Sequence, residues 1–325
     1  MKACVSVVIP LYNKEQHIER AIKSVLNQSV HDFELIVVDD GSTDNGPAIV
    51  QSINDPRIKL ILQVNSGAAA ARNRGIKEAS FDLISFLDAD DEWKPHYLEI
   101  IRGMIRRFPE AGMYSTAYEV VNEKGKKYFP KYRSIPDFPW EGIIPSYFRS
   151  ATSAWGPVWT SCVTLPKYVF DQCGDFPVSF IRGQDRDMWD RVALRFPVAF
   201  STMISATYYL NASNRYLNKK YQAVAPHPFL LKAQHLIEKG DIPKQIPQAD
   251  LEDFIAYNFI FISRTKLVHL KEPSEARRIL LNVRPQTINT AISKYLLILI
   301  SFLPQQFIKY IYELKQVYKA IMKRP

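Results

Sequence analysis

Short apolar runs alternate with amphipathic helical patterns over the first 120 residues of the chain. The apolar runs are short and often β-branched, as strands buried on both faces tend to be. They are Val5–Ile9, Glu34–Val38, Ile58–Leu62, Leu83–Leu87 and Gly112–Tyr118. Apolar residues at helical spacing fill the intervals between them. This alternation predicts an α/β fold with a mostly parallel sheet and helices on its faces.

Polar residues predict where the intervening helices begin. Asn13 is placed to cap the first helix, and Gln16 lies three residues later, where a capping box needs it. Residues suited to a helix start also precede the next three helices: Thr43 or Asp44, then Ser66, then Pro95.

Regular patterning weakens between about residues 120 and 165, where five prolines interrupt any long element. The same segment is rich in aromatic residues from Tyr128 to Trp159. Such rings could line an acceptor pocket beside the sheet, or they could simply pack the loop down, and both interpretations stay open. A helix is predicted again near Asp185–Phe196.

Helical patterns dominate after about residue 225. Leu251–Val268 has helical spacing, and Pro304 separates two amphipathic helices, Leu296–Leu303 and Phe307–Met322. The second carries lysines among its apolar residues, which is typical of a helix that rests on an anionic bilayer. Packing in a subdomain or against another subunit would give the same pattern. We expect two domains, residues 1–222 and 223–325.

Charge adds a class of partner to this picture. The 325 residues carry a formal net charge of +9, and from Lys294 onward six basic residues face one acid, Glu313. A basic excess suggests an anionic partner. Because the chain has no nucleic-acid-binding module, a nucleotide or a membrane surface is favoured over nucleic acid.

The cysteines and the apolar stretches indicate a compartment. Cys4, Cys162 and Cys173 are scattered and form neither a metal spacing nor a disulfide framework, which fits a reducing environment. A strand begins at Cys4, so no signal peptide is predicted. The longest apolar stretch, Tyr295–Leu303, is too short to span a bilayer. These features predict a cytoplasmic protein.

Carboxylates follow two of the predicted strands. Asp88-Ala89-Asp90-Asp91 comes directly after Leu83–Leu87, and Asp39-Asp40-Gly41-Ser42 ends the second strand. Open α/β sheets bind ligands at the carboxyl ends of their strands. Two carboxylates one residue apart suit a hard divalent cation, which can also hold a diphosphate. The plainer alternative is that these turns only cap the following helices.

Two further loops point to a mononucleotide. The first turn, Pro10–Asn13, contains no glycine, which argues against a dinucleotide site and against the glycine-rich loop of a nucleotidyltransferase. Tyr12 in that turn could stack on a base or staple the helix entry. The loop Asn65–Arg74 consists largely of small residues, so an anion could approach its helix, and Arg72 and Arg74 could reach phosphate. Later, Asp185 at a helix start could serve as a general base.

These motifs resemble those of the family 2 glycosyltransferases with the GT-A fold. The resemblance is carried by Val5–Asn13, Val37–Asp44, Ala71–Gly75 and Phe86–Asp91. It is close from residue 3 to about 120 and thin through Thr160–Leu194. It implies a nucleotide-sugar-binding half (1–120) and an acceptor-binding half (121–222), in an enzyme of bacterial cell-envelope or polysaccharide synthesis.

The resemblance also implies a role for each matched residue in the nucleotide loops. Pro10 and Tyr12 would lie against the base, Asp40 would bind it, and Arg72 would lie near the base or the phosphate. The donor would be a nucleotide-diphosphate sugar, with a UDP-sugar expected.

The acidic residues would carry the chemistry. Asp88 and Asp90 match the D-x-D motif, so Asp90 would hold Mn²⁺ or Mg²⁺ and Asp88 would touch the ribose or a metal-bound water. Asp185 would deprotonate the hydroxyl of a glycan or lipid-linked acceptor, and a single displacement would invert the anomeric configuration. The acceptor contacts are affected by one departure from the family, Gln184 in place of glutamate.

A second departure concerns the metal. Relatives often place a histidine some twenty-odd residues after the base, and this chain has none in Tyr208–Ser213. The two departures keep an alternative open, a non-catalytic nucleotide-sugar binder or membrane scaffold of the same fold. The C-terminal helices could equally drive homo-oligomerisation.

Overall fold

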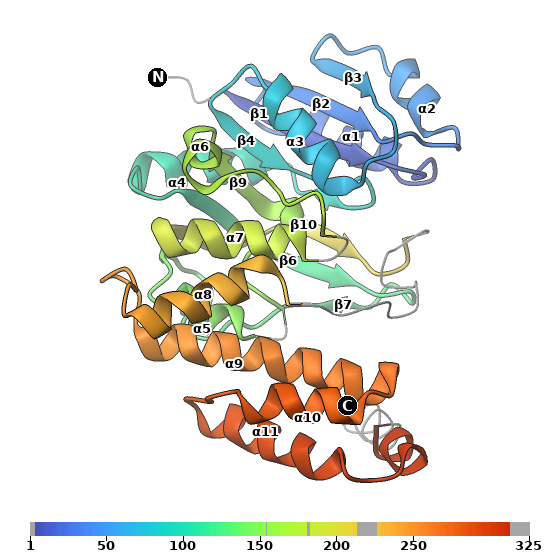
Figure 1. The fold of residues 1–325 in the computed structure, drawn as a ribbon. Helices are drawn as coiled ribbons and strands as arrows, with labels where there is room; N and C mark the ends of the chain where they lie inside the picture. Colours follow the sequence, from blue (N-terminus) through green and yellow to red (C-terminus); the bar gives the residue numbers. More distant parts are fainter. Residues whose placement is uncertain (1–3, 154, 181–182, 213–225, 313–325) are drawn as a thin grey trace. The chain divides into compact units, whose positions relative to one another are not determined.

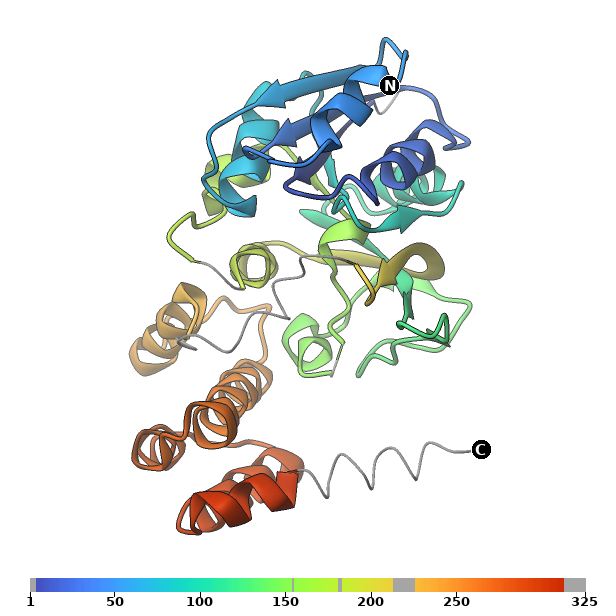
Figure 2. The ribbon, with the colours of Figure 1, turned by 90° about the vertical axis from the view of Figure 1, so that its right-hand side faces the viewer.

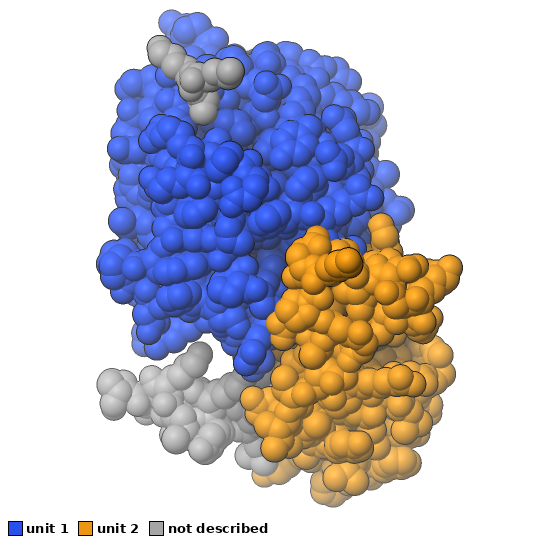
Figure 3. Space-filling view, turned by 90° about the vertical axis from the view of Figure 1, so that its left-hand side faces the viewer, with its two compact units in different colours: residues 1–215 blue, residues 216–325 orange. Residues whose placement is uncertain are grey.

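The computed structural model describes residues 4–153, 155–180, 183–212 and 226–312. The chain divides into two compact units, Met1–Arg215 and Tyr216–Pro325 (Figure 3). The domain boundary predicted between residues 222 and 223 lies in the segment 213–225, outside the described residues.

Unit 1 is built on one ten-stranded sheet (Figure 1). Its strands are β1 (Val5–Leu11), β2 (Phe33–Asp39), β3 (Ile58–Leu62), β4 (Leu83–Phe86), β5 (Glu92–Trp93), β6 (Met113–Val121), β7 (Lys127–Tyr128), β8 (Glu141–Ile143), β9 (Val163–Pro166) and β10 (Val198–Tyr209). Its helices are α1 (Ile18–Leu26), α2 (Gly46–Ser52), α3 (Ala68–Glu78), α4 (Tyr97–Arg107), α5 (Tyr147–Ala151), α6 (Tyr168–Cys173) and α7 (Gln184–Arg195), with a 3₁₀ turn at Thr160–Cys162.

The sheet is parallel on one side and mixed on the other. Its order is β3-β2-β1-β4-β9-β6-β10-β5, and the four strands from β3 to β4 are parallel as predicted. The fifth predicted strand, β6, does not continue that parallel run, because β9 lies between β4 and β6 and is antiparallel to both. β9 comes from the chain after the proline-rich segment, where no strand was predicted.

Helices cover both faces of this sheet. Figures 1 and 2 show α3, α6 and α7 on one face and α1 and α4 on the other. Alternate β1 residues, among them Val7 and Ile9, pack into the core on the α1 and α4 side. On the other face, Gly75 of α3 lies so close to the sheet that a Cβ there would be 2.3 Å from Cγ1 of Val8. Glycine therefore lets α3 approach the strands that precede the candidate site.

The predicted helix starts were less accurate than the strands. Asn13 does not cap α1, which begins at Ile18. The φ angle of Asn13 is +51°, and the Asn13 side chain accepts a hydrogen bond from the Thr43 N–H at 2.8 Å. The cap residue of α3 is Gly67 and not Ser66. Each helix thus begins later than its local signal suggests, because the polar residue serves a longer loop.

The aromatic segment is mainly a packed layer. Tyr132, Trp155 and Trp159 pack against the core of unit 1, and the Trp159 ring lies 4.3 Å from that of Tyr208 on β10. Phe129 and Phe138 remain exposed. The packing interpretation therefore describes the partly buried rings of Tyr132, Trp155 and Trp159.

Unit 2 is helical where it is described. It contains α8 (Pro228–Lys239), α9 (Gln248–Thr265), a π-helical turn (Lys266–Leu270), α10 (Pro273–Leu281) and α11 (Ile288–Ile300), followed by helical residues 305–312. Pro304 separates the last two helices as predicted, and the remainder of the predicted Phe307–Met322 helix lies outside the described residues. No helix of the described ranges is long and apolar enough to cross a membrane.

Candidate functional site

Four carboxylates gather around the loop that follows β4. Asp88, Asp90 and Asp91 belong to this loop, and Asp185 comes from the first turn of α7. Burial raises the pKa of Asp88, and the positive charge of Arg72 lowers it. The carboxylates of Asp90 and Asp185 raise it further. The structure thus brings three of the sequence-predicted acidic residues into one electrostatic neighbourhood.

Two basic side chains pair with this acidic cluster. Nη2 of Arg72, on α3, lies 2.7 Å from Oδ1 of Asp88. Nζ of Lys14, in the turn before α1, lies 2.8 Å from Oδ2 of Asp90. The loop is also held by Arg20, which donates to the backbone carbonyl of Asp90 at 2.5 Å. The acidic loop is therefore fixed by side chains from two different helical segments.

Asp91 joins the acidic loop to the second half of the sheet. Its side chain is fully buried and accepts hydrogen bonds from Ser161 Oγ at 2.5 Å and from Trp159 Nε1 at 3.3 Å. It also accepts from the backbone N–H of Tyr209 at the end of β10. These bonds give Asp91 a positioning role that differs from the helix cap considered at first, because α4 begins only at Tyr97.

Asp40 holds the neighbouring loop. Its carboxylate is 2% exposed and accepts hydrogen bonds from Gln63 Nε2 and from the backbone N–H groups of Ser66 and Gly67, each at 2.8 Å. Asp40 thus shapes the entrance to α3. Its predicted contact with a base would have to share these carboxylate oxygens.

The turn after β1 offers an aromatic surface. Pro10, near the end of β1, is half-buried, and Tyr12, just after the strand, is 44% exposed. An exposed tyrosine ring after a strand in this sheet is available for stacking on a base.

Asp185 is held at the start of α7. Gly183 precedes the helix with φ +76°, a left-handed conformation that glycine adopts without a steric penalty. Thr160 Oγ1 donates to Oδ2 of Asp185 at 3.2 Å, and the backbone N–H of Arg186 donates to Oδ1 at 2.8 Å. Gln184, the departure from the family pattern, is half-buried beside it. The flanking residue Arg182 lies outside the described residues.

Arg72 retains hydrogen-bonding capacity that the described residues do not use. The residue is only 5% exposed, yet its Nε and Nη1 have no partner within the described part of the chain. Its guanidinium lies 5.7 Å from the ring of Phe176, and the amide of the adjacent Asn73 bonds to both backbone groups of Phe176. Buried donors are normally satisfied, and an ordered water or an anion would satisfy these N–H groups.

The acidic loop fits a divalent cation that is shared with a ligand. Among the described residues, no group of three or more His, Cys, Asp or Glu side chains is placed to hold a metal. Asp88 and Asp90 nevertheless supply hard oxygen donors. Mg²⁺ typically takes one or two carboxylates and completes its shell with phosphate oxygens and water. The donor set therefore fits Mg²⁺ or Mn²⁺ only together with a diphosphate.

Some residues of the site were missed by the sequence reasoning. Lys14, His17 and Arg20 follow one another at intervals of three, and this spacing is the signal that could have found the basic side chains around Asp90. Trp159 and Ser161, which hold Asp91, had no local signal. In the region where relatives often carry a histidine, Tyr209 stacks under Arg20 at 3.8 Å and donates to Glu92 at 2.6 Å.

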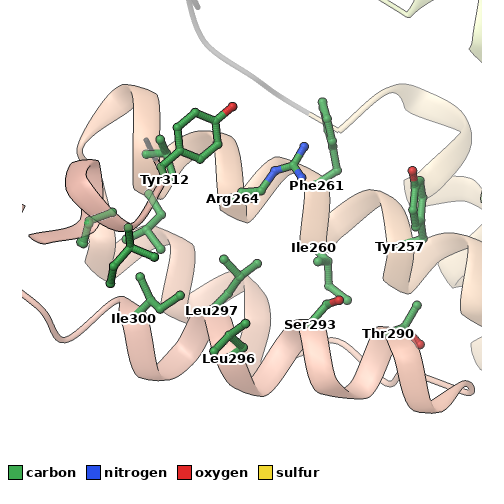
Figure 4. Close-up of a pocket in the computed structure, with 14 residues that line it drawn as sticks. Tyr257, Ile260, Phe261, Arg264, Thr290, Ser293, Leu296, Leu297, Ile300 and Tyr312 are labelled. Carbon is green, nitrogen blue, oxygen red and sulfur yellow. The ribbon is translucent and has the colours of Figure 1, made fainter. Parts of the chain in front are cut away.

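A separate groove lies in unit 2 between α9, α11 and the helical residues 305–312 (Figure 4). Its volume is about 350 Å³. Apolar side chains such as Leu297 and Ile300 line its floor, and Tyr257, Phe261 and Arg264 stand along the α9 side. The groove is within the size range of ligand pockets.

Comparison with known proteins finds a family match over the first half of the chain. The family model described as "Glycosyl transferase family 2" matches residues 6–164. A UDP-Glc:alpha-D-GlcNAc-diphosphoundecaprenol beta-1,3-glucosyltransferase, WfgD of Escherichia coli, is 42% identical over 119 residues, which are 36% of this chain and 47% of WfgD. The putative teichuronic acid biosynthesis glycosyltransferase TuaG of Bacillus subtilis is 46% identical over 101 residues, 30% of this chain and 40% of TuaG. The matched segments thus span less than half of these relatives.

A solved structure extends the likeness over the fold. The crystal structure of Staphylococcus aureus TarS 1–349 in complex with UDP-GlcNAc superposes with a TM-score of 0.66 at 17% identity, covering 96% of this chain and 92% of that one. This match confirms the predicted GT-A type of fold with additional C-terminal helices. The family match over residues 6–164 places this segment in glycosyl transferase family 2.

Proposed function

We propose that the chain transfers a sugar from a nucleoside-diphosphate sugar to an acceptor hydroxyl, with inversion at the anomeric carbon. The observation that carries this proposal is that an anion-binding group and a proton acceptor lie in one neighbourhood. Arg72 offers buried donors suited to an anion, while Asp185 offers a carboxylate suited to accept a proton. The negative charge of Asp185 contributes to raising the pKa of Asp88, the partner of Arg72, so Asp185 and Arg72 act in the same electrostatic environment.

The residues of the site divide the work of recognition. Tyr12 stacks on the base, with Pro10 beneath it and Asp40 holding the loop beside it. The unused N–H groups of Arg72 donate to the diphosphate, since charge-assisted hydrogen bonds are the strongest that a side chain can offer there. Asp88, paired with Arg72, stands next to the ribose.

The reaction needs one proton acceptor. Asp185 takes the proton of the acceptor hydroxyl as the hydroxyl oxygen forms its bond to the anomeric carbon. The bond from that carbon to the nucleoside diphosphate breaks on the opposite face, and the diphosphate keeps the electron pair. The hydrogen bond from Thr160 orients the carboxylate for this step. An oxocarbenium-like transition state is expected, as in other chemistry at anomeric carbons.

A divalent cation, Mn²⁺ or Mg²⁺, would be held by Asp90 and would neutralise charge on the departing diphosphate. Burial is the largest cause of the raised pKa of Asp88, and the carboxylates of Asp90 and Asp185 add a repulsion that a cation would relieve.

The named relatives support a class of donor and acceptor. WfgD is named for a UDP-glucose donor and a diphosphoundecaprenol-linked acceptor, and TarS was crystallised with UDP-GlcNAc. We therefore propose a UDP-sugar as donor and a glycan or lipid-linked glycan of a bacterial envelope polysaccharide as acceptor.

A donor screen tests the proposal directly. The full chain would be incubated with a panel of UDP-sugars, Mn²⁺ or Mg²⁺ and an envelope extract, and UDP release and thermal stabilisation would be measured. One UDP-sugar should raise the melting temperature and release UDP only when the extract is present. Stabilisation without acceptor-dependent release would favour the alternative, a non-catalytic nucleotide-sugar binder.

We also propose that unit 2 rests on an anionic membrane surface at the cytoplasmic face. Large apolar side chains are exposed along α11 and beyond it, including Ile288 (76%), Leu299 (68%) and Phe302 (70%). From residue 276 to 312 the sequence has five basic residues and no acidic one. Apolar exposure together with positive charge is complementary to anionic lipids. The free cysteines Cys4, Cys162 and Cys173 suit a reducing compartment.

The groove of Figure 4 strengthens this choice of partner. Leu296 and Ile311, which line it, are themselves exposed, so its apolar lining continues into the exposed apolar side chains. Arg264 stands beside Phe261 and could meet a lipid phosphate. A homo-oligomer contact through the same side chains is the competing outcome.

A further inference from the structure

Lys14 and Asp90 form an ion pair at the candidate cation site. Nζ of Lys14 is 2.8 Å from Oδ2 of Asp90, and the two side chains are only 13% and 16% exposed. They are 76 residues apart in sequence, on the turns that follow β1 and β4. Because this ion pair is shielded from water, removing one partner alone would leave the other charge buried and unpaired, at a high cost in free energy.

The ammonium group stands where a cation would bind. A divalent cation held by Asp90 needs the carboxylate oxygens, and one of them already accepts from Lys14. A metal ion with two charges interacts with a carboxylate more strongly than an ammonium with one. The two cations therefore compete for Asp90.

The backbone of the loop is held independently of this pair. Arg20 donates to the Asp90 carbonyl at 2.5 Å, and the Arg20 guanidinium stacks on Tyr209. Asp91, the next residue, is fixed by Ser161. Because these contacts do not involve the Asp90 carboxylate, Lys14 can leave it without loss of the loop conformation.

We propose that Lys14 is an internal counter-ion of Asp90 which a divalent cation displaces, and that the released ammonium then binds the diphosphate of the donor. This rests on the proposed function. Lys14 lies on the turn that carries Tyr12, so a nucleotide stacked there brings its phosphates toward the same loop. The flexible stem and three donors of lysine allow the ammonium to turn from one anion to the other.

The test separates the two halves of the proposal by equilibrium binding. Calorimetry would measure Mn²⁺ binding without nucleotide and UDP binding at saturating Mn²⁺, for the wild type, Lys14→Gln and Lys14→Arg. Lys14→Gln should bind Mn²⁺ about tenfold more tightly than the wild type. It should bind UDP about 10- to 100-fold more weakly, because a charge-assisted hydrogen bond is lost. Lys14→Arg keeps the positive charge, so its dissociation constants for Mn²⁺ and UDP should lie closer to the wild-type values than those of Lys14→Gln.

Lys23→Gln is the matched control, because Lys23 is an exposed lysine of α1 that pairs with Glu19. It should leave both constants unchanged. An unchanged Mn²⁺ constant in a folded Lys14→Gln variant would overturn the displacement, and an unchanged UDP constant would overturn the transfer to the diphosphate. Either result could occur in a protein that still transfers sugar, so it would leave the proposed function standing. A wild type that neither binds Mn²⁺ nor transfers sugar would overturn both.

Discussion

The guanidinium of Arg72 reaches the carboxylate of Asp88 at 2.7 Å and keeps its Nε and Nη1 buried without a partner among the described residues. One arginine thus fixes the acidic loop and retains two donor nitrogens for the proposed contact with the donor diphosphate. Both roles depend on α3 lying close against β1, where Gly75 permits the approach. The pair therefore links the packing of the sheet to the proposed recognition of an anion.

Replacing Arg72 by glutamine should weaken the binding of UDP. The variant loses charge-assisted hydrogen bonds of about 1.5–3 kcal/mol each, so the dissociation constant should rise at least about tenfold. Calorimetry with UDP measures this. Lys77→Gln serves as the control, because Lys77 is an exposed basic residue of the same helix. Equal UDP affinity in the Arg72 variant and this control would contradict the assignment.

Asp185→Asn should abolish most of the sugar transfer while leaving donor binding nearly intact. Removing a general base typically lowers the rate by about 10²- to 10⁴-fold. Single-turnover transfer and UDP calorimetry would be measured side by side. Asp171→Asn, an exposed acidic residue on α6, is the control. A fully active Asp185 variant would refute the role of this residue as the base.

Asp91 should make the stability of the fold depend on pH. Burial raises the pKa of Asp91 well above its usual range, and the carboxylates of Asp90 and Asp88 add to this. An unfolded aspartate titrates near pH 4, so above that pH the native state holds more protons than the unfolded state. The free energy of unfolding should therefore fall as pH rises from about 4 toward the raised native pKa.

Urea denaturation at a series of pH values checks this expectation. Asp91→Asn lacks the titrating group, and its stability should change less with pH than that of the wild type. The advantage of the wild type over the variant should be largest at acidic pH. Parallel curves for the two proteins would show that Asp91 does not retain its proton in the native state.

Gly75→Ala should destabilise unit 1. The new Cβ would lie 2.3 Å from Val8 Cγ1 and 2.9 Å from Cγ2, and overpacking of this kind typically costs about 1–3 kcal/mol. Val8→Ala in the same chain removes these contacts, so the double variant should be more stable than the sum of the two single effects predicts. Strict additivity in thermal denaturation would argue against a clash at this point.

The sequence predicted the parts of the fold that depend on local pattern. Buried strands such as Val5–Leu11 are short and apolar, and their pattern alone is sufficient. The position of Asp185 at a helix start was also predicted, and α7 begins one residue earlier. By contrast, β9 follows the proline-rich segment, and its place between β4 and β6 is set by antiparallel pairing with distant strands.

The same distinction explains what was missed in the site. Asn13 has the chemistry of a helix cap, but its side chain binds Thr43, which is thirty residues away. The binding of Asp40 to the base stays a prediction, and the additional hydrogen bonds that its oxygens accept from the loop before α3 could not be predicted from local pattern. The three-residue spacing of Lys14, His17 and Arg20 is visible in the sequence, but only the fold places Lys14 beside Asp90. Residue type predicts what a side chain can bind, and only the tertiary structure selects its partner.

The exposed helices of unit 2 should bind anionic vesicles. Leu299 and Phe302 are 68% and 70% exposed, and burying such side chains in the bilayer interface stabilises the bound state by about 1.5–3 kcal/mol each. The double variant Leu299→Glu, Phe302→Glu removes this gain and adds like-charge repulsion. Its co-sedimentation with phosphatidylglycerol vesicles should fall strongly. Because surface electrostatics is screened, high salt should weaken wild-type binding as well.

Leu231→Glu is the matched control for this test. Leu231 lies on α8 of the same unit and is 54% exposed, so the substitution tests an exposed leucine away from α11. It should leave vesicle binding unchanged. Native mass spectrometry of the same proteins distinguishes the competing role of the apolar side chains. Loss of a dimer in the double variant, with no vesicle binding by the wild type, would assign the surface to a second copy of the chain instead of to lipid.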